Sequence, residues 1–290
     1  MPPMEGQVAI EHSHRLLGAL VGFFSVLIVA ISLKNRRQIS STFFKLSLVS
    51  LGLVIFQGVL GGVTVLLKLS PLVSTAHLVT SQIFLANLLL LHFASSPKYS
   101  LSLSQWRGFD HLRFLPFVLI FCIFQMGLGA FIRHGGAALA CGLGPESMFL
   151  CRSHEDFSLV WWPTLGPAQA NMLHRYAGVL LAFLVVLGTL PTLKWAKKNN
   201  FKNIRRLVAS LHALVAFQIV LGLWTLASGI HPVIVTLHLV GGVGLWLLLW
   251  TLWGQTLQIS YSQTRMASET RVKTSSGSKE SLNFVTDLST

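Results

Sequence analysis

The sequence predicts an all-α fold: a polytopic membrane bundle of seven transmembrane helices in two pseudo-repeats, three helices plus four, with the N-terminus outside. Of its 290 residues, 52% are hydrophobic and 11% are charged, whereas soluble domains have roughly a quarter charged residues. Apolar runs near the ~20 residues that a spanning helix needs and a repeated set of motifs are the other two observations. The runs cover residues 16–33, 43–67, 76–93, 114–132, 176–193, 207–227 and 233–253.

Basic residues between these runs predict the orientation. The first, third and fifth connections carry Lys34, Arg36, Arg37 and Lys45, then Lys98, Arg107 and Arg113, then Lys194, Lys197, Lys198, Lys202, Arg205 and Arg206. Lysine and arginine are enriched in cytoplasmic loops, so the N-terminus and the loop 135–167 are expected outside. The net charge of +13 then requires no nucleic acid as a partner. No signal or transit peptide is visible at residues 1–8, which favours a bacterial cytoplasmic (inner) membrane.

Motifs recur at a nearly constant offset, which indicates a duplicated bundle. Residues 9–18, AIEHSHRLLG, have a weaker copy at 169–178, QANMLHRYAG. A Phe-Gln-x-x-Leu-Gly pattern at 56–61 returns 161 residues later at 217–222, and a Pro-x-x-x-Thr-x-His-Leu pattern at 71–78 returns at 232–239. A third Phe-Gln-x-x-Leu-Gly stands at 124–129. In these three patterns we expect glycines for close helix packing and a hydrogen-bonded glutamine.

The repeats single out four histidines as the candidate site: His14, His77, His174 and His238. Each lies near the outer start of a helix, and an ionisable side chain within a membrane is a functional hypothesis by default. Paired imidazoles inside a bundle predict axial ligands of haem iron, and the adjacent Arg15 and Arg175 are expected to bind the propionates. Two alternatives remain: a zinc or copper site, which needs three or four converging ligands, and single interfacial histidines bonded to backbone carbonyls.

A carboxylate distinguishes the first copy of the motif from the second. Glu11 precedes His14 by three residues and so lies on the same helical face, whereas Asn171 occupies the matching position in the second copy. We therefore expect two similar sites, of which only the one with Glu11 carries out proton chemistry.

The outer loop 135–167 contains Cys141 and Cys151, and Cys122 lies within the preceding apolar run, where it is expected to pack. Two nearby cysteines on the oxidising side of a membrane predict a disulfide, with two free thiols as the alternative. After Gln255 the chain becomes rich in serine, threonine and scattered charge, typical of disorder. The predicted divisions are residues 1–110 and 111–256 for the two repeats and 257–290 for a disordered cytoplasmic tail.

These motifs in combination resemble the haem A synthases, in which a Glu-x-x-His-Arg helix start, a His-Leu helix start and their second-half copies recur with cysteine-bearing outer loops. The resemblance runs from about Val8 to Trp253, and residues 135–141, Gly-Gly-Ala-Ala-Leu-Ala-Cys, look like that family's outer-loop start. It implies oxidation of a methyl group of haem O to a formyl group, which makes haem A for terminal oxidase assembly. It also implies eight helices, so this chain is expected to lack a counterpart of the family's first helix.

The resemblance implies a role for each residue of the site. His14 and His77 match the histidines that serve the substrate haem, His174 and His238 match those that hold a haem b cofactor, and Glu11 matches the catalytic acid. The expected partners are haem O, the lipid bilayer, a haem O synthase and an electron donor. The alternative function is a non-enzymatic di-haem electron carrier or a haem-binding anchor subunit, which would use the same ligands and have no need of the carboxylate.

Overall fold

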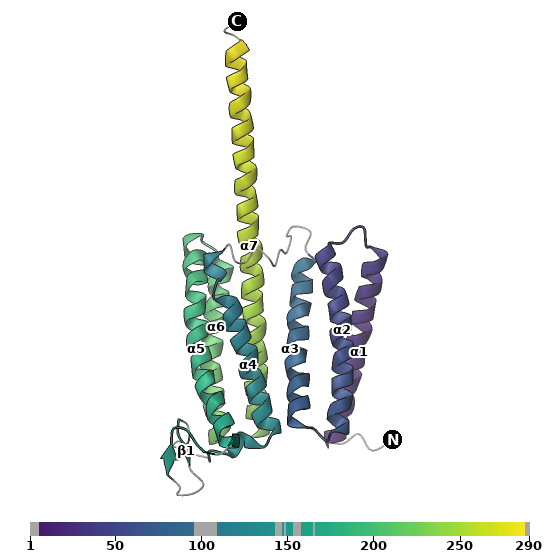
Figure 1. The fold of residues 1–290 in the computed structure, drawn as a ribbon, viewed down its shortest axis with the longest axis vertical. Helices are drawn as coiled ribbons and strands as arrows, with labels where there is room; N and C mark the ends of the chain where they lie inside the picture. The colour runs from purple at the N-terminus through teal and green to yellow at the C-terminus, as the bar shows by residue number, and fades with distance from the viewer. Residues whose placement is uncertain are drawn as a thin grey trace.

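The computed structural model describes residues 6–95, 109–142, 147, 149–152, 158–164 and 166–287. Seven long helices run up and down beside one another (Figure 1). They are α1 (Gly6–Lys34), α2 (Ser41–Leu66), α3 (Pro71–Ala94), α4 (Leu115–His134), α5 (Gly166–Lys198), α6 (Lys202–Ala227) and α7 (Pro232–Asp287). The other described elements are the 3-10 turns η2 (Asp110–Leu112) and η3 (Ala137–Leu139) and the antiparallel hairpin of β1 (Cys151–Arg152) with β2 (Leu159–Val160).

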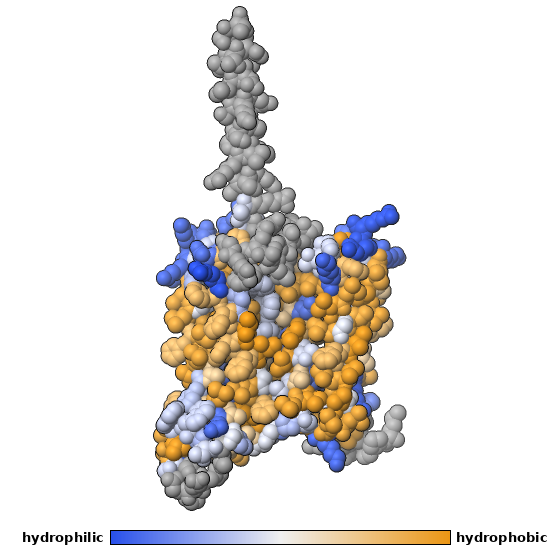
Figure 2. All heavy atoms as spheres, in the orientation of Figure 1, coloured by the Kyte–Doolittle hydropathy of each residue, from blue (hydrophilic) through white to orange (hydrophobic). Residues whose placement is uncertain are grey.

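Among the described residues, seven helices are long and apolar enough to cross a membrane, in agreement with the seven predicted spans. On the face shown in Figure 2, apolar residues dominate the middle of the bundle and hydrophilic residues gather toward its two ends. Large apolar side chains of the helices, such as Phe23, Phe56 and Phe183, are exposed. That exposure is expected where lipid surrounds a helix whose backbone groups are all bonded internally.

Local signals set where the helices begin. The Ser40 hydroxyl accepts a hydrogen bond from the Phe43 amide at 3.1 Å and caps α2, the usual role of serine at this position. Helices α3 and α7 begin with Pro71 and Pro232, where the missing amide hydrogen costs nothing because the first turn leaves it unpaired. Short reversals join α1 to α2, α2 to α3, α5 to α6 and α6 to α7, and consecutive helices are antiparallel (Figure 1).

The helices form two joined groups, here called the first half (α1–α3) and the second half (α4–α7). In the second half α4 packs on α5, α5 on α6, α6 on α7 and α7 on α4, so α5 and α7 lie diagonally across a four-helix ring. In the first half α1 packs on α2 and α2 on α3. Helix α3 also packs on α4 and α7 and so connects the halves (Figure 1). The division into three helices plus four and the pseudo-symmetry of the halves stay predictions.

Polar and close apolar contacts fasten α3 to α7. Trp246 Nε1 donates a hydrogen bond to the Gln82 carbonyl oxygen at 2.9 Å, and Gln258 Nε2 donates to the Phe93 carbonyl oxygen at 3.2 Å. Gly254 lies directly against the Phe93 ring. These contacts make the two halves one packed body along this line.

One end of the bundle carries the β1–β2 hairpin and is called the hairpin end below. Helices α1, α3, α5 and α7 all begin there (Figure 1). His14 and His174 are each the ninth residue of their helix, and His77 and His238 are each the seventh. With a rise of about 1.5 Å per residue, all four histidines lie at similar depths below the hairpin end.

The last helix is longer than the sequence predicts. The sequence places the end of the last span near Trp253 and predicts disorder at 257–290, whereas α7 continues as a helix to Asp287. The predicted domain boundary at residue 257 stays a prediction.

Candidate functional site

His14 and His77 form a pair at the hairpin end of the first half. They project from α1 and α3, and their ring centroids are 6.2 Å apart with the ring planes at 80°. Two imidazoles on opposite sides of one metal ion, with metal–nitrogen bonds of about 2 Å, have centroids roughly 6 Å apart. The spacing therefore suits two trans ligands of a single ion.

His174 and His238 occupy the matching place in the second half. They come from the diagonal helices α5 and α7, lie at similar depths from the hairpin end, and are both half-buried. The four predicted ligands thus come together as two pairs, one in each half.

The histidines of the bundle differ in whether their ring nitrogens have hydrogen-bond partners. Two histidines outside the predicted set have side-chain partners: His111 Nε2 lies 2.9 Å from Ser260 Oγ, and His212 Nε2 lies 2.8 Å from Thr189 Oγ1. By contrast, the buried Nδ1 atoms of three predicted ligands have no hydrogen-bond partner among the described residues: His77, His174 and His238. Burying an unpaired polar atom costs about 1–3 kcal/mol, so such rings require a reason beyond packing.

The donor set fits haem iron rather than a bare metal ion. Within the described ranges no group of three or more His, Cys, Asp or Glu side chains could hold an ion. Haem iron needs only axial ligands from the protein, because the macrocycle supplies the other nitrogens. Paired imidazoles from diagonal helices, in an apolar bundle, meet that requirement.

Glu11 lies one turn before His14 and forms an ion pair with Arg15. The carboxylate oxygen and the guanidinium nitrogen are 2.5 Å apart, and the side chains are 55% and 62% exposed, respectively. The first pair of histidines therefore has an accessible carboxylate and a cation on the same helix.

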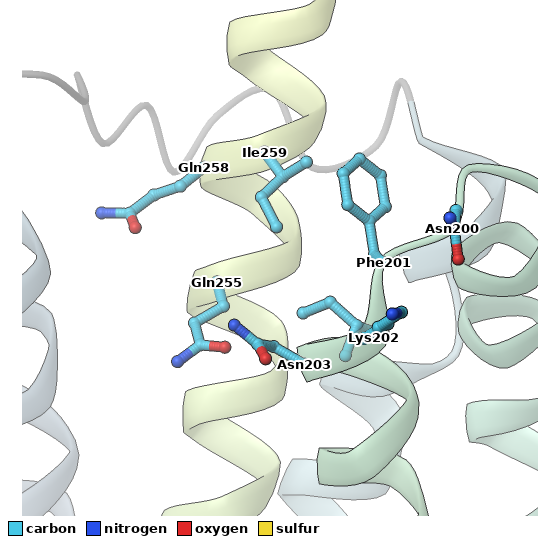
Figure 3. Close-up of a pocket in the computed structure, with 8 residues that line it drawn as sticks. Asn200, Phe201, Lys202, Asn203, Gln255, Gln258 and Ile259 are labelled. Atoms are coloured by element: carbon cyan, nitrogen blue, oxygen red, sulfur yellow. The ribbon is translucent and has the colours of Figure 1, made fainter.

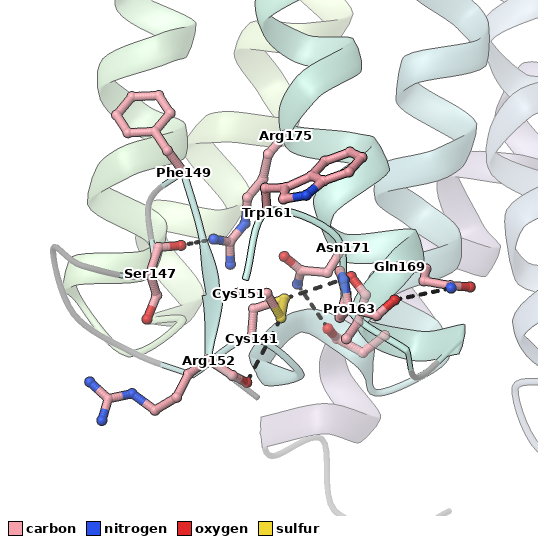
Figure 4. Close-up of a disulfide and its surroundings, with 12 residues drawn as sticks. Cys141, Ser147, Phe149, Cys151, Arg152, Trp161, Pro163, Gln169, Asn171 and Arg175 are labelled. Atoms are coloured by element: carbon pink, nitrogen blue, oxygen red, sulfur yellow. Dashed lines mark hydrogen bonds between the residues drawn. A yellow bond between two sulfur atoms is a disulfide. The ribbon is translucent and has the colours of Figure 1, made fainter. Parts of the chain in front are cut away.

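Asn171 occupies the position in the second motif that Glu11 has in the first, but it makes different contacts. It is 5% exposed, and its Nδ2 donates to the carbonyl oxygens of Ala137 and Ala138, at 2.9 Å each. The amide therefore holds the η3 turn of the outer loop against α5 (Figure 4). An acid would lack the donor that these carbonyls need, which gives a structural reason for the asymmetry between the copies.

A disulfide joins Cys141 to Cys151 (Figure 4), as predicted. Both cysteines are fully buried and pack with Ala168 and Met172 of α5. The free Cys122 is buried in α4, also as expected. The hairpin is thus stapled against the first turns of the helix that carries His174.

Arg175 and Tyr176 bind the same outer loop. The Arg175 guanidinium donates to the Ser147 carbonyl oxygen (Figure 4), and the Tyr176 hydroxyl lies 3.0 Å and 2.9 Å from the carbonyl oxygens of Phe149 and Trp161. The sequence predicts Arg175 as a propionate ligand and gives no sign of these loop contacts, because their acceptors are backbone atoms.

Two of the Phe-Gln-x-x-Leu-Gly glutamines bond to predicted ligands. Gln57 Nε2 donates to the His77 carbonyl oxygen at 3.0 Å, and Gln125 Nε2 donates to the His174 carbonyl oxygen at 2.8 Å. The expectation of a hydrogen-bonded glutamine is confirmed in these two copies. That the acceptor belongs to a histidine was not predicted, although all three copies of the pattern precede one of the four histidines in the sequence.

A hollow between α6 and α7 lies at the end of the bundle opposite the histidines (Figure 3). Lys202, Asn203, Gln255 and Gln258 are among its lining residues. Because it contains none of the four histidines, it is not part of the candidate site.

Comparison with known proteins agrees with these features. The COX15-CtaA family model, described as "Cytochrome oxidase assembly protein", matches residues 4–250 and a second time residues 166–277. The chain is 30% identical over 224 residues to the Heme A synthase of Alkalihalophilus pseudofirmus, covering 74% of this chain and 67% of that protein. Corresponding values are 28% over 202 residues, 68% and 63%, for the Heme A synthase of Halalkalibacterium halodurans, and 30% over 242 residues, 80% and 71%, for that of Shouchella clausii.

The chain thus spans about two thirds of the length of these relatives. Its matched region contains both histidine pairs, Glu11 and the disulfide. The chain therefore belongs to the COX15-CtaA family of cytochrome oxidase assembly proteins, the haem A synthases, which are oxidoreductases acting on haem O.

Proposed function

We propose that this chain binds haem O between His14 and His77 and oxidises a methyl group of the ring to a formyl group. The observation that carries the proposal is the contrast among the histidines of the spans: His111 and His212 have side-chain partners, whereas the three half-buried members of the two pairs have an unpaired Nδ1. Iron coordination through the other ring nitrogen, Nε2, would give a reason to keep these imidazoles inside the bundle despite that cost.

The first half binds the substrate, and the second half holds a haem b cofactor between His174 and His238. The presence of a carboxylate in one half only supports this division, because Glu11 is accessible while Asn171 is occupied with the η3 turn. The second match of the family model, at residues 166–277, supports a duplicated origin of the pairs. Arg15 and Arg175, each next to a ligand, are the proposed propionate-binding cations.

Conversion of a methyl to a formyl group removes four electrons from the carbon, so the reaction needs an external oxidant. Two hydroxylations balance it when each consumes one molecule of dioxygen, two electrons from the donor and two protons, and the hydrated aldehyde then loses water. A haem held in the second half would supply one-electron transfer. His14 and His77 position the substrate ring. Glu11 takes up and returns protons at its carboxylate oxygens beside the reacting methyl, and its ion pair with Arg15 holds the side chain on α1 one turn before His14.

We place the hairpin end on the outer face of a bacterial cytoplasmic membrane. The basic connections support this orientation, since Lys34, Lys197, Lys198 and Lys202 lie at the opposite end of the bundle. The disulfide agrees with an oxidising compartment on the hairpin side. Haem O carries a long isoprenoid tail, and a site inside the membrane buries that tail at low cost. A haem O synthase and an electron donor are the proposed protein partners.

The test compares Glu11→Gln with His12→Gln in membranes supplied with haem O. General acid–base catalysis contributes about 10²–10⁴-fold, so we expect Glu11→Gln to slow formation of haem A by at least 100-fold while haem binding persists. His12 is an exposed neighbour in the same turn and serves as the matched control, with the rate of the unaltered protein expected.

Full activity of Glu11→Gln would remove the carboxylate from the mechanism. Pigment extraction decides between the synthase and the electron carrier. Haem A in the extract supports the synthase, whereas haem b alone, in cells that make haem O, would replace the proposed activity with electron transfer.

A further inference from the structure

The Phe-Gln-x-x-Leu-Gly pattern does more than pack helices. In each of three places, the glycine of this pattern faces a histidine near the start of the neighbouring antiparallel helix. In two of them the glutamine, four residues before the glycine, also bonds to that histidine. We call each glutamine–glycine couple a histidine seat. The seats are Gln57 and Gly61 for His77, Gln125 and Gly129 for His174, and Gln218 and Gly222 for His238.

The glycine of each seat leaves room for the imidazole. In all three seats the nearest atom to a Cβ added at the glycine is Cε1 of the ring. The separation would be 3.5 Å at Gly61 and at Gly222, which is ordinary contact, but only 2.8 Å at Gly129. A methyl group at Gly129 would therefore have to displace the His174 ring.

The glutamine holds the backbone from which the ring projects. Gln57 and Gln125 donate to the carbonyl oxygen of the histidine itself, so the height and rotation of the ligand helix are fixed at the ligand. In the second half, each seat glutamine in turn packs against a glycine of the helix that carries the histidine: Gln125 lies against Gly178, and Gln218 lies against Gly241. Gln218 Nε2 has no hydrogen-bond partner within the described part of the chain, so its seat relies on the glycine.

Histidines that bind metals are usually oriented by a hydrogen bond from the ring nitrogen that does not bind the metal. In the seats, Nδ1 makes no hydrogen bond of good geometry to a described residue, although the backbone at Gln125 and at Gln218 lies close enough to the rings of His174 and His238 to act on them. Packing against the seat therefore contributes to setting the ring plane. Resting on the proposed function, in which these rings hold haem, we propose that the seats are positioning devices that set the imidazole planes, with Gln125 and Gly129 as the positioning residues for the second-half haem.

Each test substitution has a control of equal size elsewhere in the same bundle. Gly129→Ala is matched by Gly188→Ala, whose Cβ would lie 2.8 Å from a Val118 methyl group between the same two helices, α4 and α5. Gln125→Leu is matched by Gln258→Leu, which removes another interhelical bond from a glutamine to a backbone carbonyl. Neither control touches a histidine of the two pairs.

The full-length protein is purified in detergent with haem, and electron paramagnetic resonance spectra of the ferric low-spin haems are recorded, together with their midpoint potentials and haem retention. His238→Ala identifies the second-half signal by its loss. We expect Gly129→Ala and Gln125→Leu to shift that signal and its potential and to weaken haem retention about 10–100-fold, the usual cost of losing an orienting group. The first-half signal and both control variants should be unchanged.

Unshifted spectra and potentials in Gly129→Ala and Gln125→Leu would overturn the proposal, and so would equal shifts in Gly188→Ala and Gln258→Leu, because the effect would then be general packing. If Gly129→Ala does not fold, Gln125→Leu with its control decides. Absence of low-spin haem from the unaltered protein would instead refute the proposed function.

Discussion

Replacement of Asn171 by aspartate gives a sharply defined expectation. The substitution keeps the shape of a side chain that is 5% exposed but removes its donor, so the bonds to Ala137 and Ala138, at 2.9 Å each, are both lost. A carboxylate oxygen would then face two carbonyl oxygens. Each lost bond costs about 1 kcal/mol and each buried group left unpaired about 1–3 kcal/mol. We therefore expect the η3 turn and the first turns of α5 to be destabilised by about 2–4 kcal/mol.

Amide hydrogen exchange of the purified protein measures this change locally. With about 1.36 kcal/mol per tenfold, exchange through opening of the loop should accelerate by about 30- to 900-fold. Asn199→Asp is the control, because Asn199 also donates to a backbone carbonyl at 2.9 Å but is exposed at the opposite end of the bundle; a change within about 0.5 kcal/mol is expected there. Unaltered exchange in Asn171→Asp, or an equal loss in the control, would refute the reasoning.

Three further substitutions test other contacts, each measured as the unfolding free energy in mixed detergent. Cys141→Ser opens a disulfide between cysteines ten residues apart and should cost about 2.8 kcal/mol by loop entropy, with no further loss on adding a reductant. Thr189→Val leaves His212 Nε2 without its partner at 2.8 Å and should cost about 1–3 kcal/mol; a cost below 0.5 kcal/mol would exclude a hydrogen bond there. Gly254→Ala drives a methyl group into the Phe93 ring and should cost about 1–3 kcal/mol, recovered in part by Phe93→Leu.

Hydropathy and motif spacing predict those features of the fold and of the site that depend on local sequence. The seven spans, the pairing of histidines from α1 with α3 and from α5 with α7, and the disulfide all follow from runs and repeats visible in the sequence. Each of these features depends on residues that are close together in the sequence. A span must be apolar over its length, and two helices that begin at the same end bring their early residues to the same depth.

Contacts with backbone atoms are what the sequence does not reveal. From the sequence alone, Asn171 indicates only that the carboxylate of the first copy is lost. Its hydrogen-bond acceptors are backbone carbonyl oxygens of alanines, whose side chains give no sign of this contact. The carbonyl partners of Gln57 and Gln125 are hidden for the same reason. Arg175 reads as an anion ligand, yet it donates to the loop at Ser147. In each case the donor is visible in the sequence, but its partner is set by tertiary packing.

Helix α3 is a shared wall. It presents His77 to α1 on one side and packs on α4 and α7 on the other, where Gln82 and Phe93 bond to α7. A substitution within α3 itself is therefore expected to affect both sites, and its effect should not simply add to those of mutations elsewhere in the two halves. The two histidine pairs thus share one supporting helix. Mutants made in one pair should therefore also be measured for haem binding at the other.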